Sequence, residues 1–307
     1  MFIMNKDHIS ICICTYHRNN LLANLLKKIK DQETDNLFDF SIIVIDNDPD
    51  APAKEIVDEY RNILNLNIIY DVEPIRSIPA ARNHAIYLAT GNYIAIIDDD
   101  EFPPSQWLIT LLKAIKTFNV DGALGPVYPF FDHKPPNWII KGKFCERPIY
   151  RTGSLLEWYQ TRTGNVLLKK KVFDDHNLRF DLKLKTGSSD REFFKRATQL
   201  GYKFVFVAEA PVYEIIPPER WKKIYYIKRS VLNGYNTYLY SIKGNGIRKQ
   251  FASAIKSIIA LMIFAILFPF SLFLGPRLYV RILEKGAYHL SQLLARLGIE
   301  LIKNRDF

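Results

Sequence analysis

The sequence predicts an α/β protein built on a mostly parallel sheet, followed by an apolar helical segment near the C-terminus. Between residues 8 and 118, apolar runs of strand length alternate with amphipathic runs of helix length. An uncharged stretch of 18 residues, 257–274, stands apart from this alternation. The 307 residues suffice for one large domain with an appendage or for two modest domains.

Four rounds of strand and helix follow one another from the N-terminus. The predicted strands are short apolar runs: HISICICTY (8–16), FSIIVIDNDPD (40–50), LNIIYDVEP (66–74) and YIAIIDDDE (93–101). The predicted helices carry apolar residues at helical spacing: NLLANLLKKIK (20–30), AKEIVDEYRNIL (53–64), SIPAARNHAIYLA (77–89) and QWLITLLKAIKTF (106–118). Because helices connect the strands, we expect a mostly parallel sheet with both faces covered.

The pattern changes after this regular start. Residues 122–148 are rich in Pro, Gly and aromatic residues, which predicts an ordered loop region over a binding face. The run TGNVLLKKKVF (163–173) predicts a further strand. The run SSDREFFKRATQLG (188–201) predicts a helix that Gly201 ends, with Asp190 in its first turn.

Two of the predicted strands end in acidic residues. Asp46 ends the second, and the fourth ends in Asp98, Asp99 and Asp100. The carboxyl ends of parallel strands form ligand sites, and adjacent aspartates repel one another unless a cation or hydrogen-bond donors offset them. Since no paired His or Cys lies nearby, carboxylate oxygens indicate Mg²⁺ or Mn²⁺, shared with substrate phosphates. The alternative is a solvated acidic turn that caps the helix beginning near Pro103.

The charge and cysteine content narrow the class of protein only partly. The 42 Lys and Arg against 32 Asp and Glu favour a phosphate-bearing ligand or an anionic surface. Cys12, Cys14 and Cys145 form no CxxC pair, which favours buried thiols in a reducing compartment. Residues 1–14 lack the features of a signal peptide, so we expect residence on the cytoplasmic side.

The segment 251–276 is apolar on all sides, and its uncharged part approaches the ~20 residues that cross a bilayer. Basic residues on both flanks argue against a clean crossing. We hypothesise a helix, broken at Pro269, that dips into the cytoplasmic leaflet and is followed by an in-plane amphipathic helix over 288–303. A single span or a buried soluble helix are the alternatives.

These motifs together resemble family 2 glycosyltransferases with the GT-A fold. The run IIDDDE is similar to the family's DXD motif, which holds a divalent ion and the ribose of a nucleotide sugar. CTYHRNNLL, VIDND and RSIPAARNHAI are similar to three further motifs that contact the nucleotide. The resemblance implies nucleotide contacts at Thr15, Tyr16, Arg18, Asp46, Arg76, Arg82, Asn83, Asp98 and Asp99, and metal ligands at Asp98 and Asp100.

A closer resemblance is to the ExoM-like enzymes of exopolysaccharide and surface-polysaccharide assembly. The chain shares with them, in order, GPVYPF, TGNVLLKK, TGSSDREFFKR and VYEIIPPER, and the resemblance covers about residues 8–240. It implies that Asp190 is the general base and that Glu214 is a further metal or phosphate ligand. Ser189 stands where the family often has Glu, which leaves the acceptor class open.

The sequence thus predicts an inverting, metal-dependent transferase, with a catalytic domain over 1–240 and a membrane-association region over 241–307. The expected donor is a nucleotide sugar, a UDP-sugar first among them, and the expected acceptor is a lipid-linked saccharide. The expected location is the cytoplasmic face of the inner (plasma) membrane, as a peripheral protein. A membrane-bound nucleotide-binding protein and a nucleotidyltransferase are the alternatives. We expect no nucleic-acid partner, because acids at the strand ends would repel a phosphate backbone.

Overall fold

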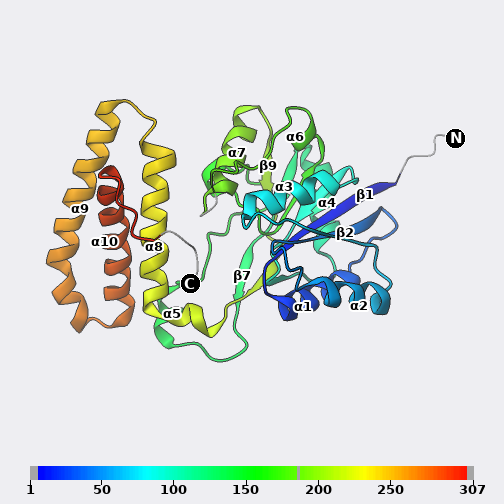
Figure 1. Ribbon diagram of the computed structural model, residues 1–307, viewed down its shortest axis with the longest axis horizontal. Coiled ribbons are helices and arrows are strands. Elements are labelled where there is room, and N and C mark those ends of the chain that lie inside the picture. Colours follow the sequence, from blue (N-terminus) through cyan, green and yellow to red (C-terminus); the bar gives the residue numbers. More distant parts are fainter. Residues whose placement is uncertain (1–5, 185–186, 303–307) are drawn as a thin grey trace. The chain divides into compact units, whose positions relative to one another are not determined.

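The computed structural model describes residues 6–184 and 187–302, which form two compact units (Figure 1). The sheet unit comprises the described residues of 1–130, 146–185 and 189–215. The helical unit comprises those of 131–145, 186–188 and 216–307. These units are groups of residues that contact one another more than they contact the rest of the chain. The predicted division at residue 240 concerns function and stays a prediction.

A seven-stranded sheet forms the centre of the sheet unit, in the order β3-β2-β1-β4-β8-β6-β9. Its strands are β1 (Asp7–Thr15), β2 (Phe38–Asp46), β3 (Ile68–Val72), β4 (Tyr93–Ile96), β6 (Gly122–Leu124), β8 (Val166–Lys169) and β9 (Phe204–Phe206). The first four run parallel to one another, whereas β8 is antiparallel to both β4 and β6. The prediction of a mostly parallel sheet is therefore confirmed.

Helices cover both faces of this sheet, as the alternating pattern predicts. They are α1 (Asn19–Lys30), α2 (Lys54–Leu64), α3 (Ile78–Leu88), α4 (Trp107–Phe118), α6 (Lys171–Asp174) and α7 (Ser189–Gln199), with a short 3-10 turn, η1 (Trp158–Gln160). In β2, Ile42 and Val44 pack with α1, α2 and α4, while Ile43 and Ile45 pack on the opposite face with α3 and α7. Because both faces are buried, the strands read as continuous apolar runs.

The region 122–148 differs from the predicted loop. It holds β6, β7 (Val127–Phe130) and the helix α5 (Asn137–Gly142). A Cβ atom at Gly125 would lie 1.9 Å from the carbonyl oxygen of Ala210, and one at Gly122 would lie 2.4 Å from the Leu168 side chain. These glycines permit close strand packing, although in the sequence they are typical of a loop. The predicted strand over 163–173 also ends early, at Lys169, where α6 follows.

A second, three-stranded sheet continues the chain after the acidic turn at Asp98–Asp100. Its order is β5 (Glu101–Phe102), β10 (Val212–Ile215) and β7, with β10 antiparallel to β5 and parallel to β7. This register places Glu214 directly opposite Glu101. A residue more than 100 positions away in the sequence is thereby brought to the acidic turn.

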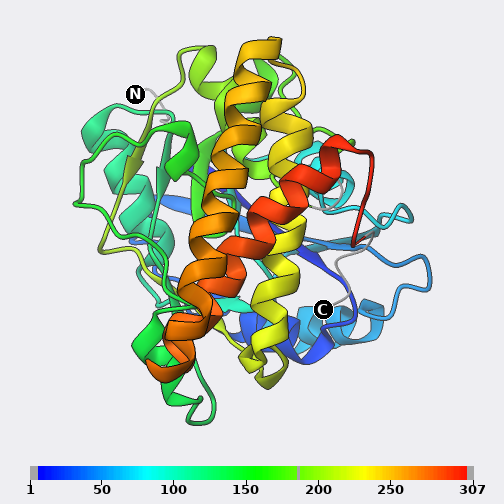
Figure 2. The same cartoon turned by 90° about the vertical axis from the view of Figure 1, so that its left-hand side faces the viewer.

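The helical unit consists mainly of α8 (Lys223–Thr237), α9 (Ile247–Phe273) and α10 (Pro276–Arg296), preceded by η2 (Pro218–Trp221) and connected by the π-helical turn η3 (Tyr238–Ile242). The three long helices lie side by side in both views, and α10 packs against α8 and α9 (Figures 1 and 2). The Ser257 hydroxyl on α9 donates to Gln292 Oε1 on α10 at 3.1 Å, and Arg296 donates to Ser253 Oγ at 3.0 Å. Polar contacts therefore hold one face of α9 to α10.

Two expectations about this segment are wrong. Pro269 lies inside α9 without breaking it, and the break falls at Gly275, whose φ of 92° suits glycine. Pro269 has an exposed position only a turn from the helix end, where the loss of one backbone hydrogen bond disrupts little. The amphipathic helix runs over Pro276–Arg296 and not over 288–303, because Pro276 is well suited to begin a helix after the Gly275 turn.

Asn165 joins three segments of the sheet unit. Its Nδ2 donates to the carbonyl oxygens of Pro126 and Ala210, both at 2.8 Å, and its Oδ1 accepts from Trp107 Nε1 at 2.7 Å. The residue is fully buried and has a positive φ of 58°. It therefore fixes the approach of β8 to the end of β6 and to the loop before β10.

We expect Asn165→Ala to lower the free energy of unfolding by about 3 kcal/mol, because it leaves buried polar groups unpaired. Asn177→Ala is the matched control, since Asn177 also has a positive φ, 47°, but is exposed. Urea denaturation of both variants separates the effect of the lost hydrogen bonds from the effect of placing Ala at a positive φ. Equal destabilisation in the two variants would contradict this role for Asn165.

Candidate functional site

The acidic turn Asp98–Asp100 lies at the carboxyl ends of β1, β2 and β4. Thr15 at the end of β1 is in register with Asp46 at the end of β2, and β4 pairs with the other side of β1. The Thr15 hydroxyl donates to Asp99 Oδ2 at 2.8 Å. The topology thus brings together the acids that the sequence places at separate strand ends.

Two arginines that the sequence assigns to nucleotide binding contact the acidic turn. Arg18 Nη1 lies 2.9 Å from Asp99 Oδ1 and 3.1 Å from Asp100 Oδ2. Arg82 Nη2 lies 3.2 Å from Asp98 Oδ1. These guanidinium groups partly offset the repulsion between the three carboxylates.

Burial and neighbouring charges raise the pKa values of the acids in and beside this turn. Burial, followed by the charges of Glu214, Asp98 and Asp99, raises the pKa of Asp100 to about 7. Burial also raises the pKa of Asp99, against the opposing effect of Arg18. Glu101 behaves similarly: burial and then Asp98 raise its pKa well above the ordinary value, and its Oε1 accepts no hydrogen bond from the residues that the structure describes. Burial thus disfavours the ionised form of these acids more than the neighbouring arginines favour it.

A second charged group lies beside this turn, and sequence reasoning missed most of it. Glu214, which the sequence does predict, accepts a hydrogen bond from Arg147 Nη2. Arg147 and Arg162 come from segments without a periodic pattern, so no sequence signal marks them. Glu101 is part of the quoted IIDDDE run, but its role depends on the pairing of β5 with β10, which cannot be read from the sequence.

Tyr16, Arg76 and Asp46 lie near the ends of the first two strands. The Arg76 guanidinium stacks over the Tyr16 ring at 4.5 Å, and this pair offers a flat face to an aromatic base. Asp46 is fully buried, and its Oδ2 accepts from the Ala53 N–H at 2.8 Å and from the Tyr70 hydroxyl at 3.0 Å. Asp46 Oδ1 has no partner in the described part of the chain, so it remains able to accept a hydrogen bond.

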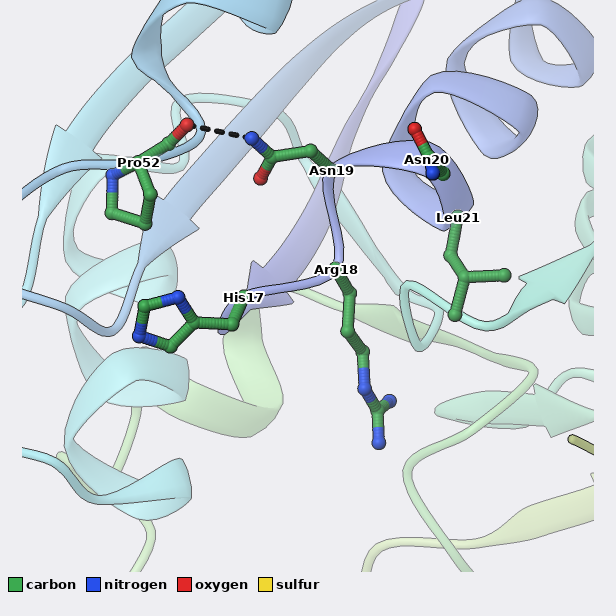
Figure 3. Close-up of a pocket in the computed structure, with 6 residues that line it drawn as sticks. All are labelled: His17, Arg18, Asn19, Asn20, Leu21 and Pro52. Carbon is green, nitrogen blue, oxygen red and sulfur yellow. Dashed lines mark hydrogen bonds between the residues drawn. The ribbon is translucent and has the colours of Figure 1, made fainter. Parts of the chain in front are cut away.

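A hollow of about 450 Å³ opens beside these residues, at the turn between β1 and α1 (Figure 3). Its lining residues are His17, Arg18, Asn19, Asn20, Leu21 and Pro52. The Asn19 amide donates to the Pro52 carbonyl oxygen at 2.7 Å and closes one side. Arg18 belongs both to this hollow and to the acidic turn, so a ligand in the hollow can reach the acids through it.

Two predicted residues are engaged elsewhere in the sheet unit. The Asn83 amide donates to the Phe180 carbonyl oxygen at 2.9 Å and accepts from the Phe180 N–H at 2.8 Å. Asp190, in the first turn of α7, accepts from the Arg191 N–H at 2.9 Å. Within 6–184 and 187–302, no hydrogen bond or ion pair joins Asp190 to the acidic turn. Both assigned roles stay predictions.

The fit of a divalent cation can be judged from the donor atoms. In the described part of the chain, no three His, Cys, Asp or Glu side chains are arranged to hold a metal ion. The carboxylates of Asp98 and Asp100 nevertheless have the chemistry that hard cations prefer, and burial together with the neighbouring acids raises the pKa of Asp100, which a bound cation would oppose. A cation therefore fits the donors, provided that the arginines release them.

Comparison with known proteins gives the family to which the chain is similar. Residues 10–177 match the family described as glycosyl transferase family 2. The chain is 31% identical to the succinoglycan biosynthesis protein ExoM of Rhizobium meliloti (strain 1021), over 81% of this chain and 80% of that one.

Two solved structures share the fold at low sequence identity. One is S. aureus TarS 1-349 in complex with UDP, with a TM-score of 0.55, 16% identity and coverage of 97% of this chain and 94% of that one. The other is the mannosyltransferase PcManGT from Pyrobaculum calidifontis in complex with GDP-Man and Mn²⁺, with a TM-score of 0.60, 16% identity and coverage of 96% and 88%.

The raised pKa of Asp100 gives a testable dependence of stability on pH. The pKa of about 7 in the folded protein exceeds the ordinary value of 3.8. Its ionisation therefore destabilises the fold progressively as the pH rises from about 4 to 7. We expect Asp100→Asn to raise the free energy of unfolding by roughly 2–4 kcal/mol more at pH 8 than at pH 4.

Urea denaturation in metal-free buffer at the two pH values would measure this difference. Asp132→Asn is the control, because Asp132 is exposed and lies outside the sheet unit. If the free energies of unfolding of wild type and Asp100→Asn differ by the same amount at both pH values, the raised pKa of Asp100 would be contradicted.

Proposed function

The chain belongs to glycosyl transferase family 2, and on this basis we propose that it transfers a sugar from a nucleotide-sugar donor to a saccharide acceptor in polysaccharide biosynthesis. The observation that carries the proposal is the convergence of Thr15, Arg18, Asp46 and the acidic turn Asp98–Asp100 on one edge of the sheet, within the matched residues. Family membership favours sugar transfer over the two alternatives considered from the sequence.

We propose a UDP-sugar as the donor. Asp46 Oδ1, which accepts no hydrogen bond from the described residues, would accept one from a base N–H group, and the Tyr16–Arg76 pair would stack on the base. Arg18 and Arg82 would then exchange the carboxylates for phosphate oxygens. The complex of S. aureus TarS with UDP supports this choice of nucleotide.

Asp98 and Asp100, with Glu214 beside them, would hold Mg²⁺ or Mn²⁺. Such an ion, when bound, supplies positive charge to the departing diphosphate. The complex of PcManGT with GDP-Man and Mn²⁺ supports a divalent cation. For Glu214 to take part, it would have to turn from Arg147, which otherwise holds its carboxylate.

Asp190 is the proposed general base of an inverting transfer. Its carboxylate would take the proton from the acceptor hydroxyl while that oxygen forms a bond to the anomeric carbon. The bond from the anomeric carbon to the diphosphate breaks on the opposite face, and its electron pair leaves with the diphosphate. Asp190 lies in the first turn of α7, within the sheet unit that also holds the acidic turn.

The helical unit supports association with an anionic membrane surface. Residues 216–307 contain 15 Lys and Arg against four Asp and Glu, whereas residues 1–215 contain 27 against 28. The net positive charge of the chain therefore resides in its C-terminal part. Anionic lipid headgroups attract such a segment, with each basic residue near the surface contributing about 1 kcal/mol.

The outward face of α9 is apolar over most of its length. Its exposed apolar side chains include Phe251, Ile255, Ile259, Met262, Ile263 and Ile266. By length and composition α9 could cross a membrane, and it is the one such helix in the described residues. Since α10 occupies its polar face, we propose that α9 lies against the cytoplasmic leaflet, where it would bring the site to a lipid-linked acceptor.

We expect Asp190→Asn to reduce sugar transfer by at least about a hundredfold, because the variant cannot accept the proton. Donor affinity should change by less than about twofold, since little volume is lost and no donor contact is proposed there. Release of UDP in the presence of acceptor measures transfer, and calorimetric titration with UDP measures binding. Turnover close to that of the wild type would remove Asp190 from the role of base.

We expect the double variant Ile263→Glu and Ile266→Glu to reduce binding to phosphatidylglycerol vesicles by at least about tenfold, because a carboxylate in the interface is costly. Ile63→Glu on α2 is the matched control, since Ile63 and Ile266 are exposed to 65% and 66%. Vesicle sedimentation measures the binding. Unchanged sedimentation of the double variant would contradict docking through α9.

A further inference from the structure

Arg162 differs from the other arginines around the acidic turn. Arg18 and Arg82 contact the aspartates, and Arg147 contacts Glu214. Arg162 is half-buried between the buried residues Thr161 and Thr163, yet among the described residues it has neither a hydrogen bond nor an ion pair. A guanidinium group removed from water without a counter-ion destabilises a fold.

No carboxylate of the described residues forms an ion pair with Arg162. Burial, followed by the charge of Arg147, lowers the pKa of Arg162 to about 10, and the charges of Glu101 and Glu214 offset this only in part. Glu214 is already bound by Arg147. An anion bound between the two guanidinium groups would relieve both their mutual repulsion and the desolvation of Arg162.

The backbone around Arg162 is held firmly near the acidic turn. A Cβ atom on Gly164 would lie 2.7 Å from Glu101 Oε1 and 3.3 Å from Asp98 Oδ2, so this loop packs directly on the acids. The next residue, Asn165, fastens the loop through its three hydrogen bonds. Arg162 therefore lies on a well-anchored segment, two residues before Gly164, which packs against Asp98. Binding residues need such a fixed backbone.

We propose that Arg162 binds a phosphoryl group of a substrate, with Arg147 beside it. This proposal rests on the proposed function, in which the anionic groups available are the donor diphosphate and a phosphate of the lipid-linked acceptor. The planar guanidinium group matches phosphate oxygens with two parallel N–H donors, and a nearby cation on the acids would balance the added negative charge. Neither the resemblance to the family nor any of the residues predicted from the sequence assigns this role to Arg162.

Calorimetric titration of the full chain with UDP, uridine, inorganic pyrophosphate and a short-chain prenyl phosphate, all with Mn²⁺, tests the proposal. The variants are Arg162→Gln and Arg162→Lys, and the control is Arg151→Gln, because Arg151 is an exposed arginine of the same unit. We expect Arg162→Gln to lower the affinity for at least one phosphate-bearing probe by about tenfold or more and to leave the affinity for uridine unchanged. We expect Arg162→Lys to retain part of that affinity.

The probes distinguish the two sources of the phosphoryl group. Weaker binding of UDP and pyrophosphate assigns Arg162 to the donor diphosphate, whereas weaker binding of prenyl phosphate alone assigns it to the acceptor. Equal affinities of wild type and Arg162→Gln for all probes would overturn the role of Arg162 and leave the proposed function intact. A wild-type protein that binds no phosphate-bearing probe would overturn both.

Thermal unfolding of the same variants separates binding from a structural role. Because Arg162 has no hydrogen bond or ion pair with any residue that the structure describes, Arg162→Gln should unfold at a temperature no lower than Arg151→Gln. A markedly lower unfolding temperature would show that Arg162 supports the fold, and would overturn the proposal.

Discussion

The site depends on one constraint: the register of the strands brings several carboxylates close together. The end of β4 supplies Asp98–Asp100, and the pairing of β5 with β10 sets Glu101 opposite Glu214. Such a group of acids in a buried place is unfavourable without positive charge. Arg18, Arg82 and Arg147 supply that charge from three segments that are far apart in the sequence. The site is thus complete only when the whole sheet unit has folded.

The sequence predicts the parts of this arrangement that follow from local periodicity. The first four strands and their helices are recognisable because strands buried on both faces leave apolar runs, and the acids stand out where those runs end. The pairing of β5 with β10 leaves no such trace, since two-residue and four-residue strands are too short for a pattern. Gly125 is typical of a loop in the sequence, although its role is to admit the Ala210 backbone.

Local periodicity also does not encode long-range packing in the C-terminal region, which explains the errors made there. Proline in a long apolar run predicts a break, but Pro269 lies near the end of α9, where the helix tolerates it. The contacts of Ser257 with Gln292 and His289 cannot be predicted, because they depend on which face of α9 meets α10. They show that α9 has an inner side and an outer side although its composition is nearly uniform. The charge difference between residues 1–215 and 216–307, by contrast, is plain in the sequence.

The ion pairs of Arg18 and Arg82 with the aspartates have a consequence for how ligands would enter the site. A nucleotide that attracts these arginines would break their ion pairs with the aspartates, and a cation that attracts the aspartates would break the same ion pairs. The second ligand to bind would no longer have to break them. Their binding should therefore show positive cooperativity, with each ligand raising the affinity for the other by the same factor. The apoprotein would then discriminate against free metal ions and free nucleotides alike, and would respond to the pair.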